Sequence, residues 1–186
     1  MNHFALKNNQ GFTLIETLVA IAVLMISIAG PLTIANKALT SALYAKDQSI
    51  ASNLGQESIE MIKNIKNNNL VNSITFLNTI DGGAGKTCIG DNGKCDVEID
   101  SGSFVIKPDC SSGCPIYFSD TSGYSHNVGG TKTIFTRYYY LTNVNKKLTG
   151  LPDPSDYMVT VVVQWYEGKV PNEVRLRGEI VNALQQ

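Results

Sequence analysis

The chain has 186 residues, of which 43% are apolar and 17% are charged, and its formal net charge is −1. This length can hold one modest domain and a membrane segment, but hardly two full domains. The charges are spread along the chain without a basic run, which argues against a nucleic-acid-binding surface and against a strongly anionic substrate.

An apolar run covers residues 12–35, and Glu16 is its only charged residue. As a helix this run would be about 36 Å long at ~1.5 Å per residue, enough to cross a hydrocarbon core of roughly 30 Å. Lys7, which precedes the run, favours a cytoplasmic N-terminus. The alternative is a secretory signal peptide that is cut at Ser27-Ile28-Ala29. Such peptides usually have a basic start and an apolar stretch of roughly 7 to 15 residues, whereas this run is longer and contains an acid.

Beyond Pro31 the helical pattern continues as two rows of apolar residues that are each spaced by eleven positions. One row is Ile28, Leu39, Ile50 and Met61, and the other is Leu32, Leu43, Leu54 and Ile65. A period of about 3.67 residues per turn keeps both rows on one face of a single long helix. We expect this face to pack on a globular domain from about residue 40 onward. Gly30-Pro31 should kink or locally melt the helix, and Asn67-Asn68-Asn69 should end it.

Downstream the period of the apolar residues changes to two, which predicts β-strands. The expected strands are a central one at 157–166, a half-buried one that follows a hairpin loop at 168–172 and reaches residue 180, one at 135–141, and short ones at 97–99 and 104–106. The predicted fold class is therefore α+β, with a long N-terminal helix packed on an antiparallel β-sheet. The stretch 81–130 is rich in Gly, Ser, Asp and Cys and is expected to form surface loops.

All four cysteines follow the apolar run, in the part of the chain that would be exported. They are Cys88, Cys95, Cys110 and Cys114. An even number in an exported domain favours disulfides, and we favour the pairs Cys88–Cys95 and Cys110–Cys114 because both close short loops. A zinc site is the competing interpretation, but the spacings lack a paired C-x2-C signature.

Two loop motifs in part match known ligand-binding motifs. Gly85-Lys86-Thr87 ends like a phosphate loop, but Ile80 stands where the motif requires its first glycine. Asp91-Asn92-Gly93 with Asp96 lacks the oxygen-ligand spacing of a helix-loop-helix calcium site. We therefore interpret both as surface turns and expect neither a cofactor nor a metal.

Candidate catalytic side chains are sparse. If the N-terminal leader is removed, His126 is the one histidine left, so no histidine-based triad is predicted. Glu57 and Glu60 are expected to form a polar edge of the helix beside Lys63 and Lys66. The sequence thus predicts that the protein is not an enzyme.

The hexapeptide at residues 11–16, Gly-Phe-Thr-Leu-Ile-Glu, followed by an apolar helix, resembles the N-terminus of type IV pilins and pseudopilins. In that family prepilin peptidase cuts a leader after its last glycine on the cytoplasmic side, and the new N-terminal residue is N-methylated. The resemblance implies that Gly11 precedes the cut and that Phe12 becomes the methylated N-terminus. It also implies that Glu16 is the fifth residue of the mature chain and serves in filament assembly.

The resemblance covers residues 1 to about 66, and together with the apolar patterns of the chain it leads us to expect four parts. These are a leader at 1–11, a transmembrane segment at 12–35, an amphipathic continuation of the helix at 36–69, and an exported antiparallel β-sheet domain with cysteine-containing loops at 70–186. Residues 51–60 resemble the same region of minor pilins of the PilV type and of the minor pseudopilins of type II secretion.

The implied function is that of a minor pilin-like structural subunit. Its expected partners are prepilin peptidase, other pilin or pseudopilin subunits, the inner-membrane assembly platform and the membrane, with nucleic acid expected only as a pilus ligand. The expected location is a single pass through the cytoplasmic membrane with an exported C-terminal domain, and a pilus or pseudopilus after assembly. Two alternatives remain open: a minor pseudopilin of type II secretion, and a membrane-tethered module that binds a ligand through its loops at 81–130.

Overall fold

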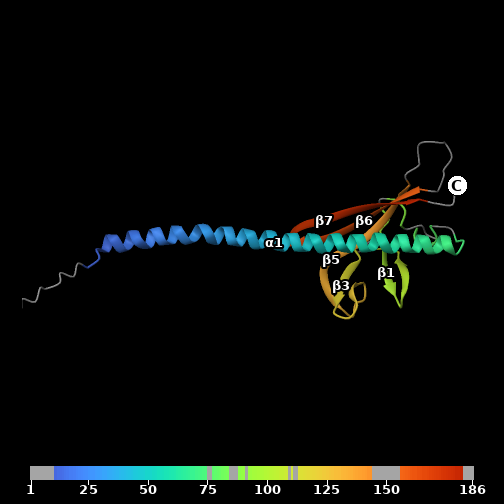
Figure 1. Cartoon of the computed structure of the whole chain (residues 1–186), viewed down its shortest axis with the longest axis horizontal. Helices are drawn as coiled ribbons and strands as arrows, with labels where there is room; N and C mark the ends of the chain where they lie inside the picture. Colours follow the sequence, from blue (N-terminus) through green and yellow to red (C-terminus); the bar gives the residue numbers. More distant parts are fainter. Residues whose placement is uncertain are drawn as a thin grey trace, which may run out of the picture. The chain divides into compact units, whose positions relative to one another are not determined.

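The computed structural model describes residues 11–74, 77–83, 88–90, 92–108, 110, 113–143 and 156–181. Two compact units make up the chain, Met1–Ala45 (the N-terminal unit) and Lys46–Gln186 (the C-terminal unit). The elements along the chain are α1 (Leu14–Val71), β1 (Asp96–Asp100), β2 (Ser103–Lys107), β3 (Pro115–Ser119), β4 (Gly123–Ser125), β5 (Thr131–Asn143), β6 (Asp156–Glu167) and β7 (Val170–Val181) (Figure 1).

Gly30-Pro31 was predicted to kink or locally melt the helix; in the N-terminal unit α1 is helical on both sides of Pro31 and across it, so it does not melt there. A proline removes one backbone donor, and here the flanking turns keep the helix intact. Large apolar side chains of this unit are exposed, among them Phe12, Ile21 and Leu32.

The C-terminal end of α1 lies two residues beyond the predicted Asn69. The amide of Ile74 donates to the carbonyl of Asn69 at 2.8 Å, and that of Ser73 donates to the carbonyl of Leu70 at 3.1 Å. Ser73 has a φ of 56°. This pair of hydrogen bonds around a left-handed residue is a Schellman motif, which ends the helix by satisfying its last carbonyl groups.

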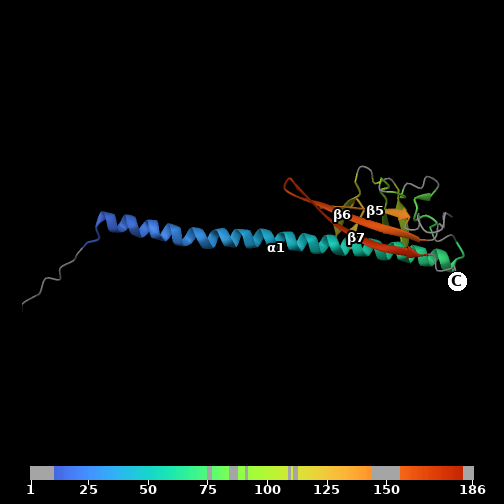
Figure 2. The ribbon, with the colours of Figure 1, turned by 90° about the horizontal axis from the view of Figure 1, so that it is seen from above.

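The C-terminal unit confirms the predicted α+β class. A five-stranded antiparallel sheet has the order β4-β3-β5-β6-β7, and β1 and β2 form a separate two-stranded sheet. The α1 residues of this unit lie across one face of the larger sheet (Figure 2). Their buried apolar side chains are Ala51, Leu54, Met61, Ile62 and Ile65, which share the core with β5, β6 and β7.

One close approach of helix and sheet depends on glycine. A Cβ atom at Gly55 would lie 2.7 Å from Cδ1 of Leu176 on β7, and one at Gly178 would lie 3.2 Å from Cγ2 of Ile59 on α1. The missing side chains at these two positions let α1 pack closely on β7.

The strands predicted near 97–99, 104–106, 135–141, 157–166 and 173–180 are confirmed as β1, β2, β5, β6 and β7. The β6–β7 turn is tighter than the predicted loop, because β7 already begins at Val170. Within 81–130, the loop-rich stretch, β1 and β2 were predicted but β3 and β4 were not. β3 and β4 are short and lie between turn residues, so they carry little periodicity.

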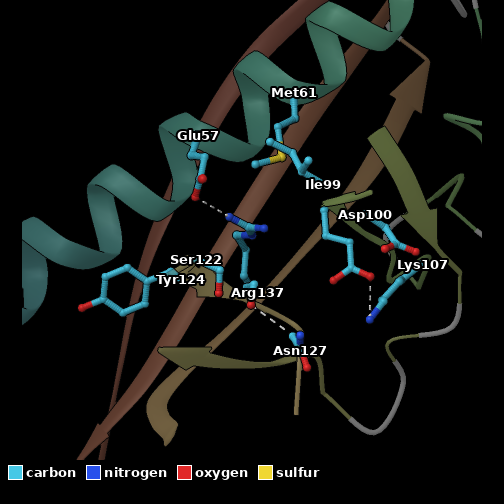
Figure 3. Close-up of a pocket in the computed structure, with 11 residues that line it drawn as sticks. Glu57, Met61, Ile99, Asp100, Lys107, Ser122, Tyr124, Asn127 and Arg137 are labelled. Atoms are coloured by element: carbon cyan, nitrogen blue, oxygen red, sulfur yellow. Dashed lines mark hydrogen bonds and ion pairs between the residues drawn. The ribbon is translucent and has the colours of Figure 1, made fainter. Parts of the chain in front are cut away.

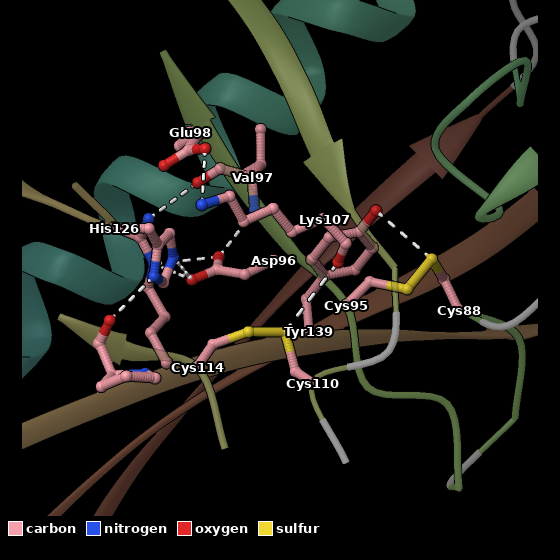
Figure 4. Close-up of a disulfide and its surroundings, with 12 residues drawn as sticks. Cys88, Cys95, Asp96, Val97, Glu98, Lys107, Cys110, Cys114, His126 and Tyr139 are labelled. Atoms are coloured by element: carbon pink, nitrogen blue, oxygen red, sulfur yellow. Dashed lines mark hydrogen bonds and ion pairs between the residues drawn. A yellow bond between two sulfur atoms is a disulfide. The ribbon is translucent and has the colours of Figure 1, made fainter. Parts of the chain in front are cut away.

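Along the edge of β5 that faces away from β6, short cysteine-containing segments continue the hydrogen bonding beyond β3. Three alternate residues of β5 each donate a backbone hydrogen bond to a cysteine carbonyl: Arg137 to Cys114 at 3.0 Å, Tyr139 to Cys95 at 2.6 Å and Leu141 to Cys88 at 2.8 Å. The disulfides pair Cys88 with Cys95 and Cys110 with Cys114, the two pairs favoured from the sequence (Figure 4). The disulfides fix these short segments at the edge of the sheet, because segments of this length bury too few apolar side chains to be held there by burial alone.

Candidate functional site

The predicted processing site lies just before α1. Gly11, Phe12 and Thr13 are not helical, and α1 begins at Leu14. All three are exposed, Phe12 by 81%. A Cβ atom at Gly11 would meet nothing within 4 Å, so the fold does not require glycine there.

Glu16 lies in the first turn of α1. Its backbone amide faces Oγ1 of Thr13 at 3.4 Å, so Thr13 is the N-cap and the pair has the Thr-x-x-Glu spacing of a capping box. A carboxylate at this end interacts favourably with the helix dipole. Among the residues that the structure describes, no cation forms an ion pair with Glu16.

The N-terminal half of α1 has a surface suited to an apolar environment. Among the described residues, α1 is the one helix long and apolar enough to cross a membrane, and its most apolar 18-residue stretch is fully exposed. Its hydroxyl groups donate to their own helix: Ser27 to the carbonyl of Val23 and Thr33 to that of Ala29, both at 2.8 Å. Polar side chains satisfied in this way can enter a bilayer or a helix bundle without unpaired donors.

The cysteines exclude the zinc alternative, because all four are in disulfides. Among the described residues no group of three or more His, Cys, Asp or Glu side chains could hold a metal ion. The motif Gly85-Lys86-Thr87 and the aspartate Asp91 lie outside the described residues, so the structure does not test those two turns.

A buried polar cluster in the C-terminal unit was missed from the sequence. Arg137, on the inward face of β5, is 3% exposed and points its guanidinium at Asp96 of β1, which is 0% exposed. Its Nε atom donates to both carboxylate oxygens at 3.0 Å, and its terminal nitrogens donate to the carbonyls of Leu54 at 3.1 Å and Val97 at 2.8 Å. One guanidinium thus joins α1, β1 and β5.

A signal for this cluster was present in the pattern of β5. Arg137 stands between Phe135 and Tyr139 on the strand face that the alternation assigns to the core. A charged residue in such a position requires a buried partner. The pattern does not say which one.

The predicted polar edge of α1 is divided between two partners. Glu57 faces Nη1 of Arg137 at 3.2 Å, whereas Glu60 forms the expected helical pair with Lys63 at 2.8 Å. Glu57 therefore extends the Arg137 cluster to the protein surface (Figure 3).

A cleft of about 430 Å³ lies between α1, the β1–β2 hairpin and β4 (Figure 3). Met61 and Ile99 are the apolar side chains of its lining. The charged groups of the lining are largely paired, since Glu98 binds Lys107 at 2.8 Å and Glu57 binds Arg137. The carboxylate of Asp100 also lines the cleft, and it accepts a hydrogen bond from the hydroxyl of Ser101 at 3.2 Å.

Two of the groups with a shifted pKa, Tyr139 and Glu173, illustrate the causes of such shifts away from the cleft. Burial, and then the nearby Asp96 and Asp81 carboxylates, raise the pKa of Tyr139, whose hydroxyl donates to the carbonyl of Ile80 at 2.8 Å. On the surface, the hydrogen bond from Arg175 lowers the pKa of Glu173. Both shifts follow from structural contacts and neither marks a reactive group.

Comparison with known proteins matches the chain to the prokaryotic N-terminal methylation motif over residues 6–30. This range includes Gly11, Phe12 and Glu16. It ends before residues 51–60, so the predicted resemblance of that segment to PilV-type minor pilins is not supported. No curated protein and no solved structure matches the chain. The chain therefore carries a prepilin-type N-terminal motif, followed by an apolar helix and an α+β unit.

Proposed function

We propose that this protein is a minor type IV pilin-like structural subunit. Prepilin peptidase would cut after Gly11, Phe12 would become the methylated N-terminus, and the processed chain would enter a filament or prime its assembly. The observation that carries the proposal is the methylation motif at residues 6–30, placed immediately before a long exposed apolar helix. Residues 1–11 would be the leader, and 12–35 the transmembrane segment.

Glu16 is proposed to set the register between neighbouring subunits. Cleavage would leave a positive amine on Phe12, and Glu16 lies four residues on, about 6 Å along the helix axis at ~1.5 Å per residue in a processed chain that is helical from Phe12. A subunit displaced axially by that distance brings its amine to this carboxylate. Burying the carboxylate of Glu16 among the apolar helices of a filament costs free energy, and pairing with the amine offsets part of that cost.

The remaining assignments follow from this role. The C-terminal unit would be exported and held to the cytoplasmic membrane by a single pass until assembly, with pilin subunits and the inner-membrane assembly platform as partners. Disulfides in that unit suit an oxidising compartment. The role is structural, and no enzymatic activity is proposed.

The test of processing is mass spectrometry of the mature N-terminus. We expect a chain that begins with methylated Phe12, and we expect Gly11→Val to leave the leader attached, because a β-branched side chain would obstruct the peptidase. Gly30→Val, a matched change inside the helix, should leave the cut unaffected. A mature chain that begins at Gly30 would instead establish a secretory signal peptide.

A further inference from the structure

His126 follows β4 and is buried against β1 and β3, with its side chain 4% exposed. Its ring faces Asp96, the buried carboxylate that also binds Arg137 (Figure 4). Filament assembly through the N-terminal helix makes no use of this histidine. The protonation state of a buried imidazole is fixed by the groups that its two ring nitrogens face.

Both ring nitrogens of His126 face acceptors. Nδ1 lies 2.9 Å from the backbone carbonyl of Pro115, a group that can only accept, so Nδ1 carries a proton. Nε2 lies 2.5 Å from Oδ2 of Asp96. Both oxygens of Asp96 already accept from Arg137, and Oδ1 also accepts from the amide of Val97 at 2.7 Å. A carboxylate held by a guanidinium and an amide is ionised and can only accept, so Nε2 must carry a proton too.

We propose that His126 is buried as the doubly protonated imidazolium and acts as a pH-sensitive clamp within the C-terminal unit. Its two donors join β1, through Asp96, to β3, through the Pro115 carbonyl. Loss of one proton leaves a ring nitrogen lone pair facing either a carboxylate or a carbonyl oxygen. The clamp is therefore closed when His126 is charged and weakened when it is neutral.

The charges around the ring support this state. Asp96 from β1 is negative, Arg137 from β5 is positive, and Glu57 from α1 faces Arg137 from the other side. Glu98 and Lys107 of the β1–β2 hairpin pair with each other. Two carboxylates thus stand against one guanidinium, and a second positive charge on His126 balances the cluster.

The clamp has a consequence for the cleft described above. The walls of the cleft come from α1, the β1–β2 hairpin and β4. The buried polar cluster joins α1, through the Leu54 carbonyl, and β1, through Asp96, to His126, the residue that follows β4. Releasing the proton of His126 would loosen the hairpin against the sheet, and the cleft with it. A proton that the folded state holds and the unfolded chain releases stabilises the fold at low pH, and this stabilisation is lost as pH rises.

The first test is ¹⁵N NMR of the processed chain, which begins at Phe12, labelled at histidine and held in detergent micelles. The chain has two histidines, His3 and His126, and processing removes His3, so one ring signal remains. At about pH 7 we expect both ring nitrogens to be protonated and their protons to be protected from exchange with water. One unprotonated ring nitrogen at that pH would overturn the proposal.

The second test is urea unfolding of the same processed chain and of its His126→Gln variant, at about pH 6 and about pH 8. The wild-type midpoint should fall at the higher pH, whereas the midpoint of the variant should be lower at the outset and hardly change. A variant with the same pH dependence as the wild type would refute the clamp. If the variant does not fold, the NMR measurement on the wild type decides.

Discussion

Replacing Arg137 by methionine removes the group that satisfies most of the buried cluster. Methionine keeps a long apolar side chain of similar length but has no group that can donate a hydrogen bond. Asp96, which is 0% exposed, loses the guanidinium that donates to both of its oxygens. The carbonyls of Leu54 and Val97 lose a donor as well. Asp96 retains the Val97 amide and His126 as partners.

The expected loss of stability is large. Breaking a buried ion pair from one side typically costs about 3 to 5 kcal/mol, and the two carbonyls add roughly 1 kcal/mol each if their effects are independent. Groups in one network are not additive, so we expect Arg137→Met to lower the free energy of unfolding by about 4 kcal/mol. With a urea m-value of about 2 kcal/mol per molar, the unfolding midpoint falls by about 2 M.

The assay is urea unfolding of the disulfide-intact full chain in detergent, followed by the fluorescence of Trp165. This residue is the one tryptophan of the chain and is 1% exposed. The matched control is Arg175→Met, because Arg175 is 51% exposed in its side chain and pairs with Glu173 at the surface. We expect the control to cost less than about 1 kcal/mol. Equal midpoints for the two variants would refute the structural role of Arg137.

Two further predictions concern the C-terminal unit. Replacing either disulfide pair by serines, Cys88 with Cys95 or Cys110 with Cys114, should lower stability by about 2 kcal/mol for loops this short, as measured by the urea midpoint; an unchanged midpoint in both variants would contradict it. Burial raises the pKa of Tyr139, so stability should be lost as pH rises above about 10, and Tyr139→Phe should flatten that alkaline loss. Tyrosinate absorbance checks this, and a Tyr139 that ionises together with exposed tyrosines would count against it.

The helix illustrates how far the sequence predicts the fold. The eleven-residue rows identify one apolar face, and its later members, from Ile50 to Ile65, pack on the sheet as expected. Packing begins later than predicted, since Leu43 is still 51% exposed. The earlier members, such as Ile28 and Leu39, are exposed in this chain. A periodic pattern shows that a helix face is apolar, but it does not show which part of the protein or which other molecule covers that face.

The buried cluster shows what the sequence could not predict. His126 and Arg137 lie 30 and 41 residues beyond Asp96 in the chain. Their contact depends on the register of β5 against the short segments at its edge, which local propensity does not determine. The proposed processing residues Gly11 and Phe12 and the proposed assembly residue Glu16 are the reverse case, because a local sequence motif predicts them whereas the fold places few contacts around them.

The measurement that tests the proposed function most directly is the recovery of the processed chain in purified filaments, for the wild type and for Glu16→Ala. Glu60→Ala is the matched control, because Glu60 is an exposed carboxylate of the same helix that pairs with Lys63. We predict that all three chains are inserted and cut, that wild type and Glu60→Ala enter filaments alike, and that Glu16→Ala is largely left in the membrane. Breaking a buried pair at about 3 to 5 kcal/mol would reduce incorporation by a hundredfold or more. Recovery of Glu16→Ala in filaments at the wild-type ratio would contradict the account.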